Sequence, residues 1–141
     1  MTNEEIFKYI DHTLLKPTAT WEEIKTLCDE AIHFGTASVC IPPCYVKPVK
    51  EAYGSKVKIC TVVGFPLGYS NFETKRVETV NALLEGAREI DLVINISNVK
   101  NKNFNRVYEE IRNIKNTTIH DPRYISRRGW EVILKVIIET C

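Results

Sequence analysis

Two oppositely charged residues stand inside apolar runs, and they are the strongest candidates for chemistry in this chain. Asp91 lies within EIDLVINI, and Lys135 lies within VILKVII. Burying a carboxylate without a partner is costly, so Asp91 requires a cation or hydrogen-bond donors nearby. Lys135 is the natural partner if both side chains point into the same interior. Such a pair either handles protons or is only a structural ion pair, and the spacing leaves both readings open.

Lys135 has two readings of its own. An apolar site lowers the pKa of a lysine, and the resulting neutral amine is a nucleophile that forms Schiff bases with carbonyl substrates. Alternatively, Lys135 stays protonated and serves only as a charge partner. Paired lysines are far commoner than reactive ones, so the second reading carries more weight.

Weaker candidates are Asp11, Thr13 and Cys40, which lie in two earlier apolar segments. Asp11 and His12 face opposite sides of a strand, so they do not form a dyad, and we expect His12 to be structural. Cys40 and Cys44 form a C-x₃-C pair without a second pair at zinc spacing. We therefore expect no metal, and Cys40 reads most simply as a small core residue.

Composition narrows the class of protein. The chain has 141 residues, 44% hydrophobic residues and a formal net charge of +1, which gives no electrostatic argument for a nucleic-acid or membrane partner. No apolar run reaches the roughly 18–20 residues of a membrane span, and the N-terminus does not resemble a signal peptide. Five cysteines, an odd number, favour reduced thiols. We expect a cytoplasmic globular protein.

The elements that must position these residues alternate between strands and helices. Capping boxes at Thr2 and Thr20 predict two helix starts, and Ser70 with Glu73 predicts a third, with Val77 and Leu84 among its inward-facing residues. The predicted helices cover 3–9, 20–35, 45–53, 70–86 and 104–114. The predicted strands cover 10–15, 37–43, 57–66, 89–96 and 132–138.

Strands that are apolar on both faces and joined by helical crossovers predict a parallel sheet, in either an open doubly wound fold or a (β/α)₈ barrel. Single polar residues at alternating strand positions favour the barrel, because inward-facing polar groups build its site. We predict an α/β fold of the TIM (β/α)₈ barrel family, here an incomplete barrel with about five parallel strands. Residues 1–141 form part of one domain, with an atypical polar segment at 116–130.

Five stretches together resemble deoxyribose-phosphate aldolase, a class I aldolase family. They are IDHTLLKP (10–17), ASVCIPPCYV (37–46), KICTVVGFPLG (58–68), KRVETVNALLEGAREIDLVINI (75–96) and LKVIIETC (134–141). The resemblance implies a barrel lyase that reversibly cleaves 2-deoxy-D-ribose 5-phosphate to acetaldehyde and D-glyceraldehyde 3-phosphate in deoxyribonucleotide catabolism. It implies no cofactor and no metal, a phosphorylated sugar as the small-molecule partner, and homo-oligomers.

The same resemblance assigns roles to residues. Asp91 matches the proton-relay aspartate, and Lys135 matches an active-site lysine on strand five that is not the Schiff-base residue. Cys40 matches a cysteine that lines the pocket, and Asp11 and Thr13 match polar residues of the first strand. The Schiff-base lysine belongs to strand six and is expected beyond the last residue of this chain.

We therefore expect the chain alone to associate and to have negligible aldolase activity. Two alternatives remain open at this point. One is a non-catalytic interaction module derived from a barrel, and the other is a doubly wound binding domain of another superfamily.

Overall fold

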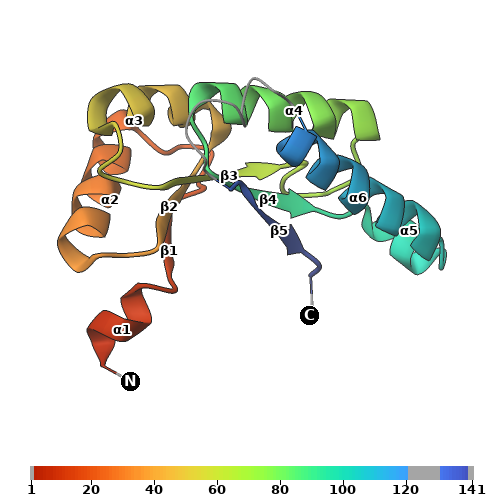
Figure 1. The fold of residues 1–141 in the computed structure, drawn as a ribbon, viewed down its shortest axis with the longest axis horizontal. Coiled ribbons are helices and arrows are strands. Elements are labelled where there is room, and N and C mark those ends of the chain that lie inside the picture. Colours follow the sequence, from red (N-terminus) through yellow and green to blue (C-terminus); the bar gives the residue numbers. More distant parts are fainter. Residues whose placement is uncertain (1, 121–130, 140–141) are drawn as a thin grey trace.

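A computed structural model describes residues 2–120 and 131–139 and shows an α/β fold (Figure 1). The predicted segment 116–130 lies largely outside this description. The strands are β1 (Asp11–Thr13), β2 (Ser38–Ile41), β3 (Ile59–Val63), β4 (Glu89–Val93) and β5 (Ile133–Ile137). The helices are α1 (Asn3–Phe7), α2 (Trp21–Phe34), the 3₁₀ turn η1 (Pro43–Tyr45), α3 (Val46–Tyr53), α4 (Phe72–Glu85), α5 (Ile96–Lys100) and α6 (Phe104–His120).

The strands form one parallel sheet in the order β1-β2-β3-β4-β5. A doubly wound sheet would reverse its strand order at a switch point, and this sheet does not. Sequential parallel pairing with helical crossovers is the arrangement of a barrel wall. The predicted fold class is confirmed, and the doubly wound alternative is excluded.

The two faces of the sheet have different surroundings. The outer face carries the main core, in which Ile24 of α2 packs with Val39, Ile59 and Ile90 of the strands. Figure 1 shows α2, α3, α4 and α6 in an arc around this face. The opposite face carries a small buried cluster of Cys40, Cys60 and Val62. Successive strand residues point to opposite faces, so this second face also receives the charged side chains described below.

The helix starts largely follow the predicted caps. Thr2 and Thr20 form capping boxes with Glu5 and Glu23, as predicted. The third prediction is wrong by one residue. Asn71 is the N-cap of α4, and its side chain accepts hydrogen bonds from the Thr74 backbone and hydroxyl.

Helix α4 also presents a face that matches the predicted one only in part. Val77 and Leu84 are about half exposed, whereas Lys75 and Thr79 are fully buried. The Lys75 ammonium is compensated inside the protein, since it donates to the Val93 carbonyl oxygen at 2.8 Å and to Glu110 at 2.9 Å. A helical stripe drawn from apolar residues alone cannot include such a lysine.

Two further differences concern the C-terminal half. The short helix α5 was not predicted, and it begins where the Asn95 side chain accepts the Asn98 backbone N–H. Helix α6 continues six residues beyond the predicted end at 114. No helix in the described part of the chain is long and apolar enough to cross a membrane.

Candidate active site

Strand register brings the charged residues of the inner face together. Asp91 in β4 lies directly opposite Lys135 in β5, and Val62 of β3 lies opposite Asp91 on its other side. Asp11 lies at the other edge of the sheet, opposite Ser38 of β2. The sheet therefore curves enough for the Lys135 side chain to reach from β5 to β1, where its ammonium donates to Asp11 Oδ2.

The Lys135 ammonium contacts three carboxylates. Besides its hydrogen bond to Asp11, Lys135 Nζ lies 3.0 Å from Asp91 Oδ1 and 3.2 Å from Glu89 Oε2. The other Glu89 oxygen lies 3.2 Å from the Lys58 ammonium. The contact between Lys135 and Asp91 is an ion pair that lacks hydrogen-bond geometry. Asp91 Oδ1 is buried, and it accepts no hydrogen bond of good geometry from the described residues.

The neighbouring charges determine the protonation of the cluster. Burial alone would lower the pKa of Lys135, but the hydrogen bond to Asp11 and the adjacent Asp91 raise it above its ordinary value. Burial likewise acts to raise the pKa of Asp11, but hydrogen bonds from Lys135 and Ser38 hold it below its ordinary value. Lys135 is therefore an ammonium at neutral pH and not a free amine, which argues against the nucleophile reading.

Two cysteines complete the inner face. The Cys40 thiol donates to Asp91 Oδ2 at 3.8 Å, and Cys60 Sγ lies 3.5 Å from the Lys135 ammonium. The neighbouring Cys40, burial and Asp91 together raise the pKa of the Cys60 thiol, so it stays protonated. Donor atoms of these two cysteines and Asp91 lie within 4.8 Å of one another. The Lys135 ammonium already supplies a cation beside them.

Thr13 and His12 lie apart from this cluster. Thr13 is exposed, and its hydroxyl donates to the backbone carbonyl of Asp11. His12 points to the other face and contacts Glu30 at 2.7 Å, which agrees with a structural role. The structure thus brings four of the five candidates together, namely Asp11, Cys40, Asp91 and Lys135.

Glu89 was missed by the sequence analysis. Its side chain is 5% exposed and contacts both Lys58 and Lys135. The signal was present, because Glu89 stands two residues before Asp91 and strand side chains repeat with a period of two.

The loop after β3 approaches the end of β4 very closely. Gly68 has a φ of +67°, and a Cβ placed there would lie 2.0 Å from the carbonyl oxygen of Ile94. Only glycine fits this position, because both the backbone conformation and the space exclude a side chain. The VVGFPLG stretch therefore fixes the loop against the strand that carries Asp91.

A parallel sheet in sequential order, with helices on one face and a charged cluster on the other, defines a member of the (β/α)-barrel class. Residues 6–119 match the model of the DeoC/LacD family aldolases, and this chain belongs to that family.

Relatives and solved structures agree with this assignment. The chain is 57% identical over 141 residues to deoxyribose-phosphate aldolase of Clostridium botulinum strain Alaska E43, and it spans 59% of that protein. It is 49% identical over 138 residues to the Clostridioides difficile strain 630 enzyme, 98% of this chain and 58% of that one.

Among solved structures, the aldolase QR15 gives a TM-score of 0.82 at 35% identity, over 96% of this chain and 56% of that one. The tetrameric deoxyribose phosphate aldolase of Aeropyrum pernix gives a TM-score of 0.74 at 29% identity, over 96% of this chain and 65% of that one.

Proposed function

We propose that this chain forms the N-terminal part of a deoxyribose-phosphate aldolase, an aldehyde-lyase that cleaves 2-deoxy-D-ribose 5-phosphate to acetaldehyde and D-glyceraldehyde 3-phosphate. The observation that carries the proposal is the convergence of Asp11, Asp91 and Lys135 on the inner face of a barrel wall. The three residues come from β1, β4 and β5, and the side chains of Asp11, Asp91 and Lys135 are 27%, 18% and 33% exposed. The names of the relatives supply the substrate and the reaction.

Asp91 is the group we assign to proton transfer. Its Oδ1 lies buried 3.0 Å from the Lys135 ammonium and accepts no hydrogen bond of good geometry from the described residues, so it keeps acceptor capacity for a substrate hydroxyl. Cys40 donates to the other oxygen and orients the carboxylate. Asp91 would remove a proton from the substrate hydroxyl as the carbon–carbon bond breaks, and return it in the reverse reaction.

Lys135 has an electrostatic role in this proposal. Its raised pKa keeps it positive, so it offsets the charge of Asp11 and Asp91 and holds both carboxylates in place. The Schiff-base amine must come from another lysine. We assign it to the part of the relatives, about two fifths of their length, that this chain does not span. Asp11 and Thr13 complete the substrate-binding side of the first strand.

The test is an acetaldehyde-release assay on the 141-residue chain, combined with borohydride trapping of any Schiff base. We expect no turnover and no reduced adduct on Lys135, because an ammonium cannot attack a carbonyl. A trapped Lys135 adduct with turnover comparable to that of the C. botulinum relative would overturn the proposal.

A non-catalytic interaction module is the second candidate. The observation that favours it is that β1 and β5 are the two edges of the described sheet. Edge strands present unpaired backbone groups that pair with other chains. Two results together would support the module over the aldolase. The chain would associate to the same extent with and without substrate, and no longer form of the protein would have aldolase activity.

A further inference from the structure

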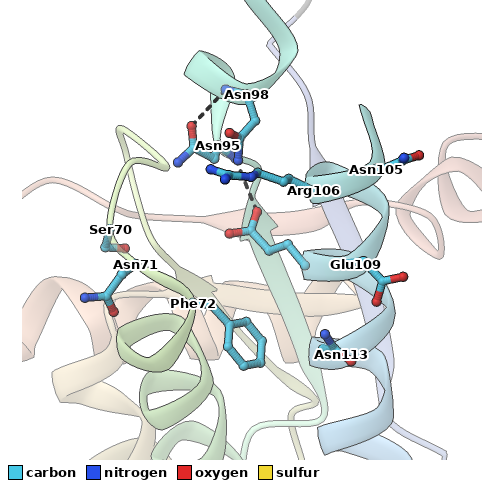
Figure 2. Close-up of a pocket in the computed structure, with 10 residues that line it drawn as sticks. Ser70, Asn71, Phe72, Asn95, Asn98, Asn105, Arg106, Glu109 and Asn113 are labelled. Carbon is cyan, nitrogen blue, oxygen red and sulfur yellow. Dashed lines mark hydrogen bonds between the residues drawn. The ribbon is translucent and has the colours of Figure 1, made fainter. Parts of the chain in front are cut away.

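A cavity lies away from the charged cluster, between the start of α4 and helices α5 and α6 (Figure 2). Its volume is about 390 Å³, within the roughly 300–1,000 Å³ of small-molecule sites. It shares no lining residue with the Asp91 and Lys135 cluster. It belongs to the loops that follow β3 and β4, whereas that cluster lies on the inner face of the strands.

Charge around the cavity is unevenly compensated. Glu110 is paired with Lys75 at 2.9 Å, and Glu109 is paired with Arg112 at 2.6 Å. Arg106 has no ion-pair partner in the part of the chain that the structure describes. Figure 2 shows its side chain reaching from α6 toward Asn95. Among the described residues the cavity therefore offers one unpaired positive charge, and each of its two carboxylates already has a cationic partner.

The neutral polar groups of the wall are amides and a hydroxyl, which can donate hydrogen bonds. The side-chain oxygen of Asn95 accepts the Asn98 backbone N–H, which leaves the Asn95 amide group as a donor toward the cavity. Figure 2 shows the Asn98 side chain beside it. The Ser70 hydroxyl is buried in the opposite wall and makes no hydrogen bond with the described residues. Buried hydroxyls normally find partners, so this one is suited to a ligand group.

An apolar surface completes the cavity. Phe72, the first residue of α4, is partly buried against the core and presents its ring between α4 and α6 (Figure 2). An aromatic ring beside amide donors and a guanidinium fits a ligand with a C–H face, hydroxyl groups and one oxyanion.

We propose that this cavity binds a small hydroxylated oxyanion, either a phosphate monoester or a hydroxycarboxylate. Arg106 binds the oxyanion, Asn95, Asn98 and Ser70 bind hydroxyl groups, and Phe72 packs against the carbon skeleton. The site is separate from the proposed aldolase site. In the part of the chain that the structure describes, none of these residues forms a hydrogen bond or ion pair with Asp91 or Lys135.

Equilibrium dialysis of the 141-residue chain against radiolabelled glycerol 3-phosphate tests this site. We expect saturable binding of one molecule per chain. Loss of a charge-assisted hydrogen bond in Arg106→Gln should weaken binding at least about tenfold. Asn98→Ala should weaken it less. Both positions are partly or fully exposed, so the variants should keep the native circular dichroism spectrum.

Arg76→Gln is the matched control. Arg76 is a partly exposed arginine on α4 that pairs with Glu73 and does not line the cavity. This variant should bind glycerol 3-phosphate like the unmodified chain. Equal weakening in Arg76→Gln and Arg106→Gln, or no saturable binding, would overturn the proposal.

Competition identifies the source of the oxyanion. Stronger displacement of the probe by inorganic phosphate than by malate assigns the site to phosphate monoesters, and the reverse assigns it to hydroxycarboxylates. Glycerol carries the hydroxyls without the charge and should not compete. If glycerol displaced the probe at concentrations similar to those of the anionic competitors, the site would not recognise charge. That result would contradict the role of Arg106.

Discussion

Replacing Lys135 by methionine removes the one ammonium that holds three carboxylates together. Methionine keeps an unbranched chain of similar length but cannot compensate charge. Asp91 and Asp11 then remain on the inner face as neighbouring negative charges, together with Glu89. We therefore expect a loss of stability that is specific to this lysine.

The contacts set the size of the loss. Removing one partner of a buried ion pair costs about 3–5 kcal/mol. The Lys135 side chain is 33% exposed, and Ser38 and Lys58 still contact Asp11 and Glu89 in the variant. Both facts reduce the penalty, and we expect the free energy of unfolding to fall by about 2–3 kcal/mol at pH 7.

Urea unfolding at low micromolar protein concentration, followed by circular dichroism, measures this loss. Lys58→Met is the control, because Lys58 is 47% exposed and within residues 2–120 and 131–139 forms one ion pair, with Glu89. It should cost no more than about 1 kcal/mol. Equal losses in the two variants would refute the reasoning, as would a Lys135→Met chain as stable as the unmodified one.

The pH dependence follows from the direction of the two pKa shifts. Asp11 has a lowered pKa, so its stabilisation is present above its ordinary value of 3.8 and is lost as pH falls through the lower folded value. Lys135 has a raised pKa, so its stabilisation is fully present below 10.5 and is lost at higher pH. The deficit of Lys135→Met should be largest between about pH 5 and 10 and should shrink below pH 3.8. A deficit that grows on acidification would contradict this assignment.

Three further predictions concern the fold. Gly68→Ala should destabilise the chain more than Gly35→Ala in urea unfolding, because both positions have a φ of +67° but only Gly68 lies against a backbone oxygen. Gly35→Ala should lower the free energy of unfolding by about 1–2 kcal/mol. Equal losses in the two variants would show that the approach of Gly68 to the Ile94 carbonyl oxygen does not exclude a side chain. Lys75→Met should cost about 3–5 kcal/mol. Adding Glu110→Gln should recover part of that loss in a double-mutant cycle, whereas strictly additive losses would show that the buried pair is not coupled. Cys44 should react first among the four described cysteines with a bulky thiol reagent, because the other three are buried. Peptide mass spectrometry would contradict this if a buried thiol reacted first.

Local patterns predicted much of the fold. Capping boxes located the starts of α1 and α2, and the alternation of strands with helical crossovers predicted the parallel sheet. Each capping box and each apolar run is a signal of a few neighbouring residues, and tertiary contacts did not override these signals. The period of two in the strands also indicated that Asp91 and Lys135 could share one face, and the register places them opposite each other.

Features that depend on distant contacts could not be predicted. Lys75 reads as a solvent-facing residue of an amphipathic helix, and its burial depends on a carbonyl at the end of β4 and on Glu110 of α6. Lys135 and Asp11 are 124 positions apart in the sequence, and their contact depends on the curvature of the whole sheet. The cavity beside Arg106 likewise exists only because the start of α4 and helices α5 and α6 meet there.

We propose that the inner face of this chain is one part of a deoxyribose-phosphate aldolase site. The most direct measurement joins residues 1–141 to the part of the C. botulinum relative that this chain does not span, and follows acetaldehyde release from 2-deoxy-D-ribose 5-phosphate. The account predicts that the chimera turns over substrate and that Asp91→Asn in the chimera lowers kcat at least about 100-fold, as expected for loss of a general acid–base. A folded chimera without activity, or one whose activity survives Asp91→Asn, would contradict it.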